Sequence, residues 1–257
     1  MTKNETSGNQ QRIYNALAGI YPLWRDALLE GAETNQVEFL TNTFRSSFTK
    51  IRSVIDLGCG VGTHAGPLAQ QGFDVTGYDK SPEALRIASR TYPSLRAIRG
   101  SFEKINLEET FDASICMWST INYILNKADL HHFMGWLSNH VHHIIVIDQP
   151  NFHKYPSSFQ KTYRAENDTN LITIKREWTL DQSLLRKTSY EYDLLNKNTG
   201  IRKKIYDSET QQFFQMNTLT EIMGNRWELV YALGDYSLST PFDAISSKRM
   251  ITVYKKL

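Results

Sequence analysis

One short stretch, Val54-Ile55-Asp56-Leu57-Gly58-Cys59-Gly60-Val61-Gly62, constrains the fold of this chain more than any other feature. Its apolar start is typical of a buried strand, and closely spaced glycines follow before a segment of helical character. Glycines bring the backbone near a ligand because no Cβ lies in the way. The N-terminus of the following helix also offers free N–H groups and a partial positive charge. The stretch predicts a strand–turn–helix unit whose turn holds a nucleotide or the carboxylate of an amino acid.

A second acidic residue, Asp79, ends the next predicted strand, seventeen residues beyond Gly62. A carboxylate at that place can accept both hydroxyl protons of a ribose. The glycine spacing is G-x-G-x-G, whereas a dinucleotide fold requires G-x-G-x-x-G for its pyrophosphate. Asp56 precedes the first glycine by two residues and would repel a pyrophosphate, but it can orient the ammonium of a bound amino acid. A nicotinamide enzyme and a glycine-rich turn without a ligand remain as alternatives.

Strand-like and helical segments alternate from about residue 53 to residue 150. This rhythm predicts an α/β fold with a parallel sheet covered on both faces. The predicted helices include Thr63 to Gln71 and Lys127 to His140. The predicted strands are Ser53 to Leu57, Phe73 to Tyr78, Leu95 to Ile98, Phe111 to Met117 and Ile144 to Asp148.

Beyond Pro150 the pattern changes to long strand-like runs. Leu171 to Leu180, Leu184 to Leu195 and Ile201 to about Phe214 are separated by turn residues, which predicts an antiparallel meander. A helix from Thr218 and two strands, Trp227 to Leu233 and Arg249 to Lys255, are expected to end the fold.

The composition indicates which partners and which compartment to expect. The 257 residues are 40% hydrophobic and carry a net charge of +2, which gives little support to a nucleic-acid or membrane partner. The two cysteines do not form a disulfide framework, and the polar N-terminus does not resemble a signal peptide. We therefore expect a soluble cytoplasmic protein. The histidine groups at 131–132, 140 and 142–143 lack acidic or cysteine partners at ligand spacing, so no metal site is predicted.

The glycine motif together with Asp79 resembles the cofactor signature of class I S-adenosylmethionine-dependent methyltransferases. The segment Ala18-Gly19-Ile20-Tyr21 is similar to an N-terminal tyrosine motif of that family, although Pro22 stands where an Asp usually follows. The end of the chain and the meander resemble small-molecule members, namely amino-sugar N-methyltransferases and enzymes like glycine N-methyltransferase.

This resemblance implies a doubly wound, seven-stranded Rossmann-like sheet with an antiparallel β insertion between strands 5 and 6. The implied parts are an N-terminal helical lid (1–50), a cofactor-binding core (51–150), the insertion, which forms part of the acceptor pocket (151–217), and a segment that completes the core sheet (218–257).

The cofactor implied by the resemblance is S-adenosyl-L-methionine. The family usually has Gly-Asp after the third strand, where this chain has Gly100-Ser101-Phe102, so Ser101 or Phe102 is expected at the adenine instead. The residues expected around the cofactor are Tyr21, Asp56, Gly58, Gly60, Gly62, Asp79, Lys80, Ser101, Phe102 and Met117.

The acceptor is expected at the carboxyl ends of the strands, where ligands bind in open α/β sheets. Asp148 and His153 are the candidate general bases, since either could take a proton near neutral pH, and Tyr123 is a third candidate catalytic residue. The expected acceptor contacts are Trp118, Asn122, Tyr123, Arg176, Tyr190 and Tyr192. Packing roles for Trp118, an ordinary loop role for His153, and an exposed charged sheet around Arg176 remain as alternatives.

The function predicted from these residues is methyl transfer to a nitrogen, in preference to an oxygen, of a small molecule. The alternatives are a methyltransferase for RNA or protein, and a cofactor-binding protein without turnover. The sequence leaves open whether the protein forms a homodimer.

Overall fold

The computed structural model describes residues 23–25, 27 and 35–257. The chain divides into two compact units. One unit consists of residues 34–154 and 212–257, and the other of residues 1–33 and 155–211. The helix Gln36–Arg45 (α3) lies in the first unit. The predicted division into a lid, a cofactor-binding core, an insertion and a C-terminal completion of the sheet stays a prediction.

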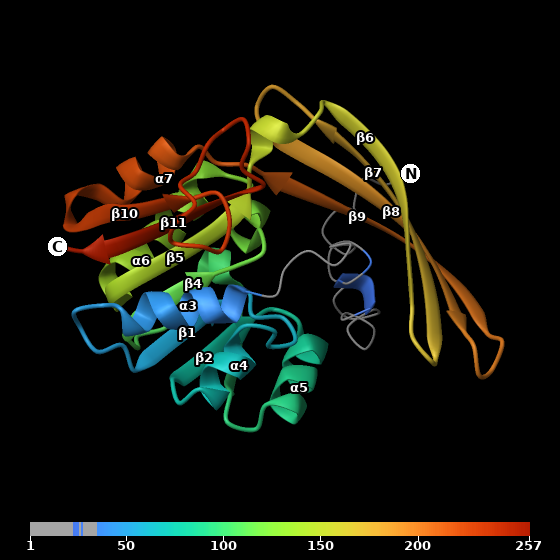
Figure 1. The fold of residues 1–257 in the computed structure, drawn as a ribbon, viewed down its shortest axis with the longest axis horizontal. Helices are drawn as coiled ribbons and strands as arrows, with labels where there is room; N and C mark the ends of the chain where they lie inside the picture. The colour runs from blue at the N-terminus through green and yellow to red at the C-terminus, as the bar shows by residue number, and fades with distance from the viewer. Residues whose placement is uncertain (1–22, 26, 28–34) are drawn as a thin grey trace. The chain divides into compact units, whose positions relative to one another are not determined.

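The first unit is built on a seven-stranded sheet with the order β10-β11-β5-β4-β1-β2-β3 (Figure 1). Strands β1 to β5 pair in parallel, and β11 pairs antiparallel with both β5 and β10. This is the predicted Rossmann-like arrangement. The strands are Ser53–Leu57 (β1), Asp74–Asp79 (β2), Arg96–Arg99 (β3), Phe111–Cys116 (β4), Val141–Pro150 (β5), Trp227–Leu233 (β10) and Arg249–Lys256 (β11).

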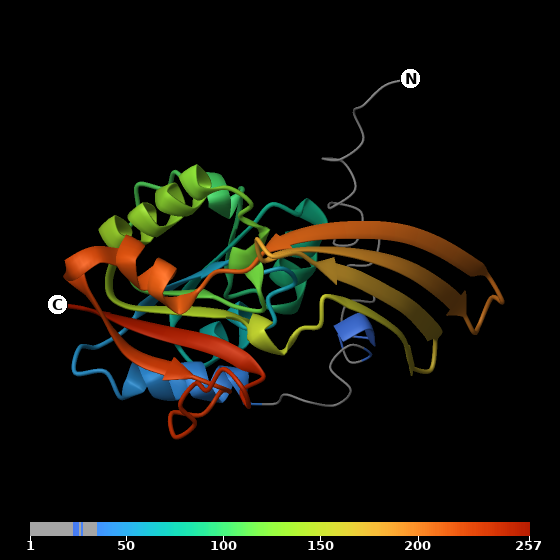
Figure 2. The ribbon, with the colours of Figure 1, turned by 90° about the horizontal axis from the view of Figure 1, so that it is seen from above.

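Helices cover both faces of this sheet, as its apolar strands require. In Figure 2, α6 and α7 lie above the sheet and α3 lies below it. The helices are α3, Ala65–Gln70 (α4), Pro82–Thr91 (α5), Lys127–His140 (α6) and Met216–Met223 (α7), with short 3₁₀ turns at Phe102–Lys104 (η2), Thr120–Tyr123 (η3), Phe152–Lys154 (η4) and Gly224–Arg226 (η5).

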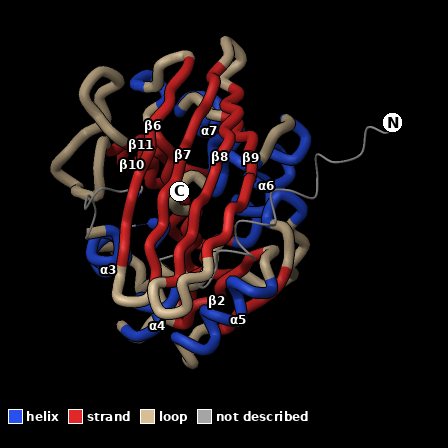
Figure 3. Tube along the Cα trace, turned by 90° about the vertical axis from the view of Figure 1, so that its right-hand side faces the viewer, coloured by secondary structure: helices blue, strands red, loops and turns tan. Residues whose placement is uncertain are grey.

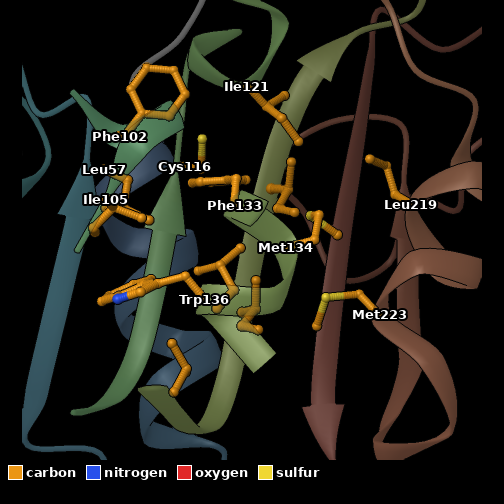
Figure 4. Close-up of a cluster of buried hydrophobic side chains, with 14 of the residues drawn as sticks. Leu57, Phe102, Ile105, Cys116, Ile121, Phe133, Met134, Trp136, Leu219 and Met223 are labelled. Atoms are coloured by element: carbon orange, nitrogen blue, oxygen red, sulfur yellow. The ribbon is translucent and has the colours of Figure 1, made fainter. Parts of the chain in front are cut away.

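Two hydrophobic clusters flank the sheet. One includes Phe102, Phe133 and Trp136 with residues of α7 (Figure 4). The other includes Phe39 and Leu40 of α3 with Leu68 of α4. A side-chain hydrogen bond fixes the start of α5, because the Ser81 side chain accepts from the N–H of Ala84 and so caps the helix. This packing fixes the carboxyl ends of the parallel strands.

The second unit contains a four-stranded sheet in the order β6-β7-β8-β9 (Figure 3). Its strands are Ser158–Glu166 (β6), Asn170–Leu180 (β7), Leu185–Asn196 (β8) and Arg202–Gln212 (β9). The meander therefore has four strands rather than the three predicted. β6 is an edge strand of mostly polar residues, so its apolar alternation is weak, which is why the sequence pattern missed it.

Candidate functional site

The glycine turn follows β1 in the sheet and lies beside the end of β2. Gly58, Gly60 and Gly62 all adopt positive φ angles of 77°, 54° and 84°, which residues with a Cβ rarely adopt. The N–H of Gly58 donates to the carbonyl of Tyr78 at 2.7 Å, and the N–H of Gly60 donates to Asp79 Oδ2 at 2.9 Å. Asp79 is thus joined directly to the turn, as parallel pairing of β1 with β2 allows.

The three glycines have different surroundings. A Cβ on Gly58 would lie 2.3 Å from the Thr120 side chain, and one on Gly62 would lie 3.2 Å from the ring of Tyr92. A Cβ on Gly60 would meet nothing within 4 Å. Gly58 and Gly62 are therefore explained by packing inside the protein, whereas Gly60 leaves open space above the turn.

Asp56 lies beneath this turn with only 1% of its surface exposed. Within the described part of the chain its Oδ2 has no hydrogen-bond partner. Burial, reinforced by the negative charge of Asp79, raises the pKa of Asp56 from 3.8 to about 8. A buried carboxyl group with an unused oxygen fits a cationic ligand group, because a cation would stabilise its ionised form.

Asp79 is half-buried at the end of β2, and it has acceptor capacity left. Its Oδ1 accepts from the N–H of Ser81 at 2.8 Å and its Oδ2 from Gly60, while each carboxylate oxygen can accept two hydrogen bonds. Burial raises the pKa of Asp79, and the hydrogen bonds from Ser81 and Gly60 oppose that rise. The open Gly60, the unpaired Asp56 oxygen and the partly available Asp79 are a set of groups that fits an amino acid joined to a ribose.

The other expected cofactor residues have mixed environments. Phe102 is buried, with its ring centroid 5.6 Å from that of Phe133, and Ser101 is half-buried just before η2. Lys80 is half-buried after β2, and Met117 is 2% exposed after β4. Their proposed cofactor contacts remain predictions. Tyr21 lies outside the described residues.

The backbone after β4 has an uncommon conformation at two adjacent residues. Trp118 and Ser119 have φ angles of 55° and 68° although neither is glycine. The N–H of Trp118 donates to Asp148 Oδ2 at 2.9 Å, and the N–H of Ser119 donates to the Asp148 carbonyl at 3.1 Å. Residues held in such a conformation cluster at functional sites, because the surroundings must compensate the strain.

Asp148 anchors this segment. Its side chain is fully buried and also accepts hydrogen bonds from Tyr236 Oη at 3.0 Å and Arg249 Nε at 2.8 Å. A general base needs a lone pair that can reach the acceptor. The contacts of Asp148 therefore disfavour the base role expected from sequence and favour a positioning role for its carboxylate.

Asn122 and Tyr123 follow in η3. The Asn122 side chain is fully buried and donates to Gln149 Oε1 and to the carbonyl of Gln212, both at 2.9 Å. Gln149 in turn donates to the carbonyl of Phe214. These bonds commit the Asn122 amide to structure, whereas its Oδ1 has no partner in the described residues. Tyr123 is half-buried, and its contact with an acceptor remains a prediction.

His153 is exposed on η4, after β5. Its ring centroid lies 4.2 Å from that of Phe152, and its backbone N–H donates to Asn151 Oδ1 at 3.2 Å. The imidazole lies on the surface after a strand of the parallel sheet, so of the two candidate bases it has the freer side chain.

The remaining expected acceptor residues lie on one face of the four-stranded sheet in the second unit. Arg176, Tyr190 and Tyr192 alternate with outward residues, as the strand period predicts. Ile172 and Ile174 lie on this face and form a hydrophobic cluster with Leu23 and Ala27 of the N-terminal segment. The alternative of an exposed charged sheet is wrong for this face, because Arg186 is 3% exposed and Tyr192 is fully buried.

Sequence reasoning did not identify several residues of these networks. Tyr236, Arg249 and Gln149 come near Asp148 or Asn122 only through folding, and nothing local in the sequence marks them. Glu209, which accepts from Tyr190 Oη at 2.7 Å, was hidden in a polar edge strand.

Two further findings concern other kinds of site. Among residues 23–25, 27 and 35–257, no group of three His, Cys, Asp or Glu side chains could hold a metal ion. Within the same residues, the helices are too short or too polar to span a membrane.

Comparison with known proteins bears on this geometry. Residues 54–143 match the family model of a methyltransferase domain, which covers the glycine turn, Asp79 and the segment after β4. Residues 54–143 of this chain are therefore similar to a methyltransferase domain. The expected resemblance and its cofactor are thereby confirmed.

The curated relatives match only part of this chain. A putative methyltransferase of Bacillus subtilis, YqeM, is 31% identical over 122 residues, which is 46% of this chain and 47% of the relative. The dTDP-3-amino-3,6-dideoxy-alpha-D-glucopyranose N,N-dimethyltransferase of Streptomyces fradiae is 27% identical over 161 residues, 62% of each chain. A mitochondrial ubiquinone biosynthesis O-methyltransferase of Schizosaccharomyces pombe is 30% identical over 124 residues, 44% of this chain and 45% of the relative. The chain thus spans about half to three fifths of these relatives.

Solved structures extend the likeness of fold to nearly the whole chain. The crystal structure of Streptomyces venezuelae DesVI superposes with a TM-score of 0.79 at 16% identity and covers 93% of this chain and 98% of its own. At this identity the likeness shows the fold alone.

Proposed function

We propose that the chain transfers a methyl group from S-adenosylmethionine to a nitrogen of a small molecule, with an amino sugar as the favoured class of acceptor. The observation that carries the proposal is the combination at the glycine turn: open space above Gly60, a buried Asp56 oxygen without a partner in the described residues, and Asp79 bonded to the turn. The family match over residues 54–143 supports the cofactor. The Streptomyces relative that dimethylates an amino sugar supports the acceptor class.

When bound, the cofactor supplies an activated methyl group on its sulfonium. The protein binds and orients it. Asp56 would pair with the ammonium of the amino-acid portion, the open Gly60 backbone would leave room for that portion, and Asp79 would accept hydrogen bonds from the ribose hydroxyls. Tyr21, Lys80, Ser101, Phe102 and Met117 complete the proposed cofactor contacts, with Gly58 and Gly62 shaping the turn.

The acceptor is proposed to lie near the backbone after β4, where Asp148 and Arg249 hold Trp118 in place. Trp118, Tyr123 and Asn122 Oδ1 are its proposed contacts. Arg176, Tyr190 and Tyr192 are proposed separately as ligand contacts of the insertion. Alignment of the acceptor nitrogen with the methyl group is the main contribution of the protein, since orientation supplies about 7–11 kcal/mol in such reactions.

His153 is proposed to take the proton that an amine acceptor loses. An amino sugar is largely protonated at neutral pH and must lose one proton to expose its lone pair. An imidazole is the side chain best suited to accept that proton in this range. The exposed position of His153 allows the proton to pass on to water.

The test is transfer of a labelled methyl group to panels of amino sugars, phenols and RNA, with binding of S-adenosylhomocysteine measured separately by calorimetry. We expect turnover on an amino sugar. Turnover on phenols alone would support O-methylation, in line with the ubiquinone-pathway relative. Turnover on RNA alone, or absence of S-adenosylhomocysteine binding, would contradict the proposal.

The base role has its own test. His153→Ala should lower turnover at least tenfold and shift its pH profile, with little change in S-adenosylhomocysteine affinity. His131→Ala, on the exposed surface of α6, is the matched control and should leave both unchanged. An equal loss of turnover and cofactor affinity in His153→Ala would remove this residue from the proposal.

A further inference from the structure

One face of the insertion sheet carries Arg176, Trp178 and Tyr190. The guanidinium of Arg176 has unusual surroundings on this face. The Arg176 guanidinium lies 4.9 Å from the ring centroid of Trp178 and 5.6 Å from that of Tyr190. Stacking on aromatic rings uses the flat faces of a guanidinium and leaves its N–H donors in the plane. These donors are the part of Arg176 that could bind a ligand.

Nothing in the described protein uses the Nε donor. Arg176 Nε is shielded from solvent and has no hydrogen-bond acceptor among the described residues. No carboxylate of these residues forms an ion pair with Arg176 either. A buried donor without an acceptor is uncommon in folded proteins, and a bound ligand is one way in which its hydrogen bond is made.

The neighbouring Arg186 gives an internal comparison. It lies on the same face of the next strand, but it bonds to Gln211 and lies 3.7 Å from Glu209. Glu209 also accepts from Tyr190. The protein therefore supplies Arg186 with polar partners from β9 in addition to the rings of Tyr155 and Trp178. Arg176 lies over aromatic rings as well, but it forms no hydrogen bond or ion pair with a described residue.

A second cation stands directly across from Arg176. Lys161 on β6 is the register partner of Arg176 on β7, and residues opposite each other in a sheet share a face. The Lys161 ammonium lies 4.9 Å from the ring centroid of Tyr163 on the same strand. The register thus places a second positive charge on the same face as Arg176.

We infer that Arg176, with Lys161 beside it, binds an oxyanion on a small molecule. The planar fork of a guanidinium matches two oxygens of a phosphate or a carboxylate, and the aromatic rings fix its orientation. The binding site itself is independent of the methyl transfer; only the assignment of the oxyanion to the acceptor rests on the proposed function.

The experiment measures binding of three probes by calorimetry: thymidine 5′-diphosphate, inorganic pyrophosphate and benzoate. Arg176→Gln removes the fork and the charge, and Arg176→Lys retains the charge without the fork. Lys175→Gln is the matched control, because it removes the same charge from the adjacent residue on the opposite, exposed face.

We expect at least one probe to bind the wild-type protein, and Arg176→Gln to weaken it more than tenfold. Arg176→Lys should give an intermediate loss, and Lys175→Gln a change below twofold. A loss confined to the diphosphate and pyrophosphate identifies a phosphate, and a loss confined to benzoate identifies a carboxylate.

Three outcomes would overturn the inference. They are the absence of binding by all three probes, equal affinity in Arg176→Gln and wild type, and an equal loss in Lys175→Gln. S-adenosylhomocysteine affinity, measured on the same samples, tests the cofactor site separately and reports whether each variant is folded. Where Arg176→Gln fails to fold, Arg176→Lys decides the result.

Discussion

The carboxylate of Asp79 accepts a hydrogen bond from the backbone N–H of Gly60 across 2.9 Å, so the end of β2 holds the glycine turn after β1 in place. This bond joins the residue proposed to bind the ribose to the residue proposed to pass beneath the amino acid. The two halves of the cofactor would therefore be held by one connected piece of backbone and side chain.

Asp79→Ala should weaken S-adenosylhomocysteine binding by about 2–3 kcal/mol, because the charge-assisted ribose bonds and the support of Gly60 are lost together. Asp74→Ala is the control, since Asp74 is an exposed acidic residue at the other end of the same strand. Calorimetry on both variants checks the prediction. Unchanged affinity in Asp79→Ala, or an equal loss in Asp74→Ala, would contradict it.

Gly60→Ala should reduce cofactor affinity more than tenfold because its new methyl group would enter the open space above the turn. Gly72→Ala provides a close control: Gly72 also has a positive φ, 93°, and a Cβ at this position would also meet no atom within 4 Å. Both variants should lose about 1–2 kcal/mol of stability from backbone strain. Only Gly60→Ala should lose affinity; equal affinities in the two variants would argue against a ligand above Gly60.

Much of this fold follows from short-range patterns. The predicted helix Lys127 to His140 and the predicted strand Trp227 to Leu233 agree with the structure at both ends. An N-cap asparagine before α6 and a regular apolar pattern define such elements locally. The glycine turn was also predictable, because strand, turn and helix are contiguous in sequence.

The networks around the candidate acceptor site were not predictable in this way. Asp148 and Arg249 are 101 residues apart, and their contact depends on the antiparallel pairing of β11 with β5. Sequence patterns identify Asp148 as an acidic residue at a strand end, but the same pattern fits a free base and an anchored ion pair. Only the fold distinguishes these roles.

The pH dependence of stability should report on Asp56. Burial raises the pKa of this carboxyl to about 8 in the folded protein, from 3.8. Between these values the unfolded chain has lost the proton that the folded protein retains, so the free energy of unfolding should fall as pH rises from about 4 to 8 and level off above. Asp56→Asn should remove this component, measured by urea unfolding of the cofactor-free protein. A difference between the two proteins that does not change with pH would contradict the assignment.

The same carboxyl should release a proton when the cofactor binds. At pH 7 a group with a pKa near 8 is mostly protonated, and a cationic ammonium beside it would lower that pKa. Calorimetry of S-adenosylmethionine binding in buffers of different ionisation enthalpy should show release of somewhat less than one proton. Asp56→Asn should abolish the release, and release of the same size in this variant would assign it to another group.

Arg249→Met should destabilise the protein by about 3–5 kcal/mol, because it leaves the fully buried Asp148 carboxylate without its cation. Arg202→Met is the control: Arg202 pairs with Asp193 at the surface, where solvent screens the pair and its loss should destabilise the protein far less. Urea unfolding of both variants measures the difference. Asp148 also accepts a hydrogen bond from the N–H of Trp118. Arg249→Lys keeps the charge but weakens the contact with Asp148. This variant should therefore raise the KM for the acceptor more than it changes S-adenosylhomocysteine affinity. Destabilisation by Arg249→Met no larger than that by Arg202→Met would mean that the pair does not anchor the backbone after β4.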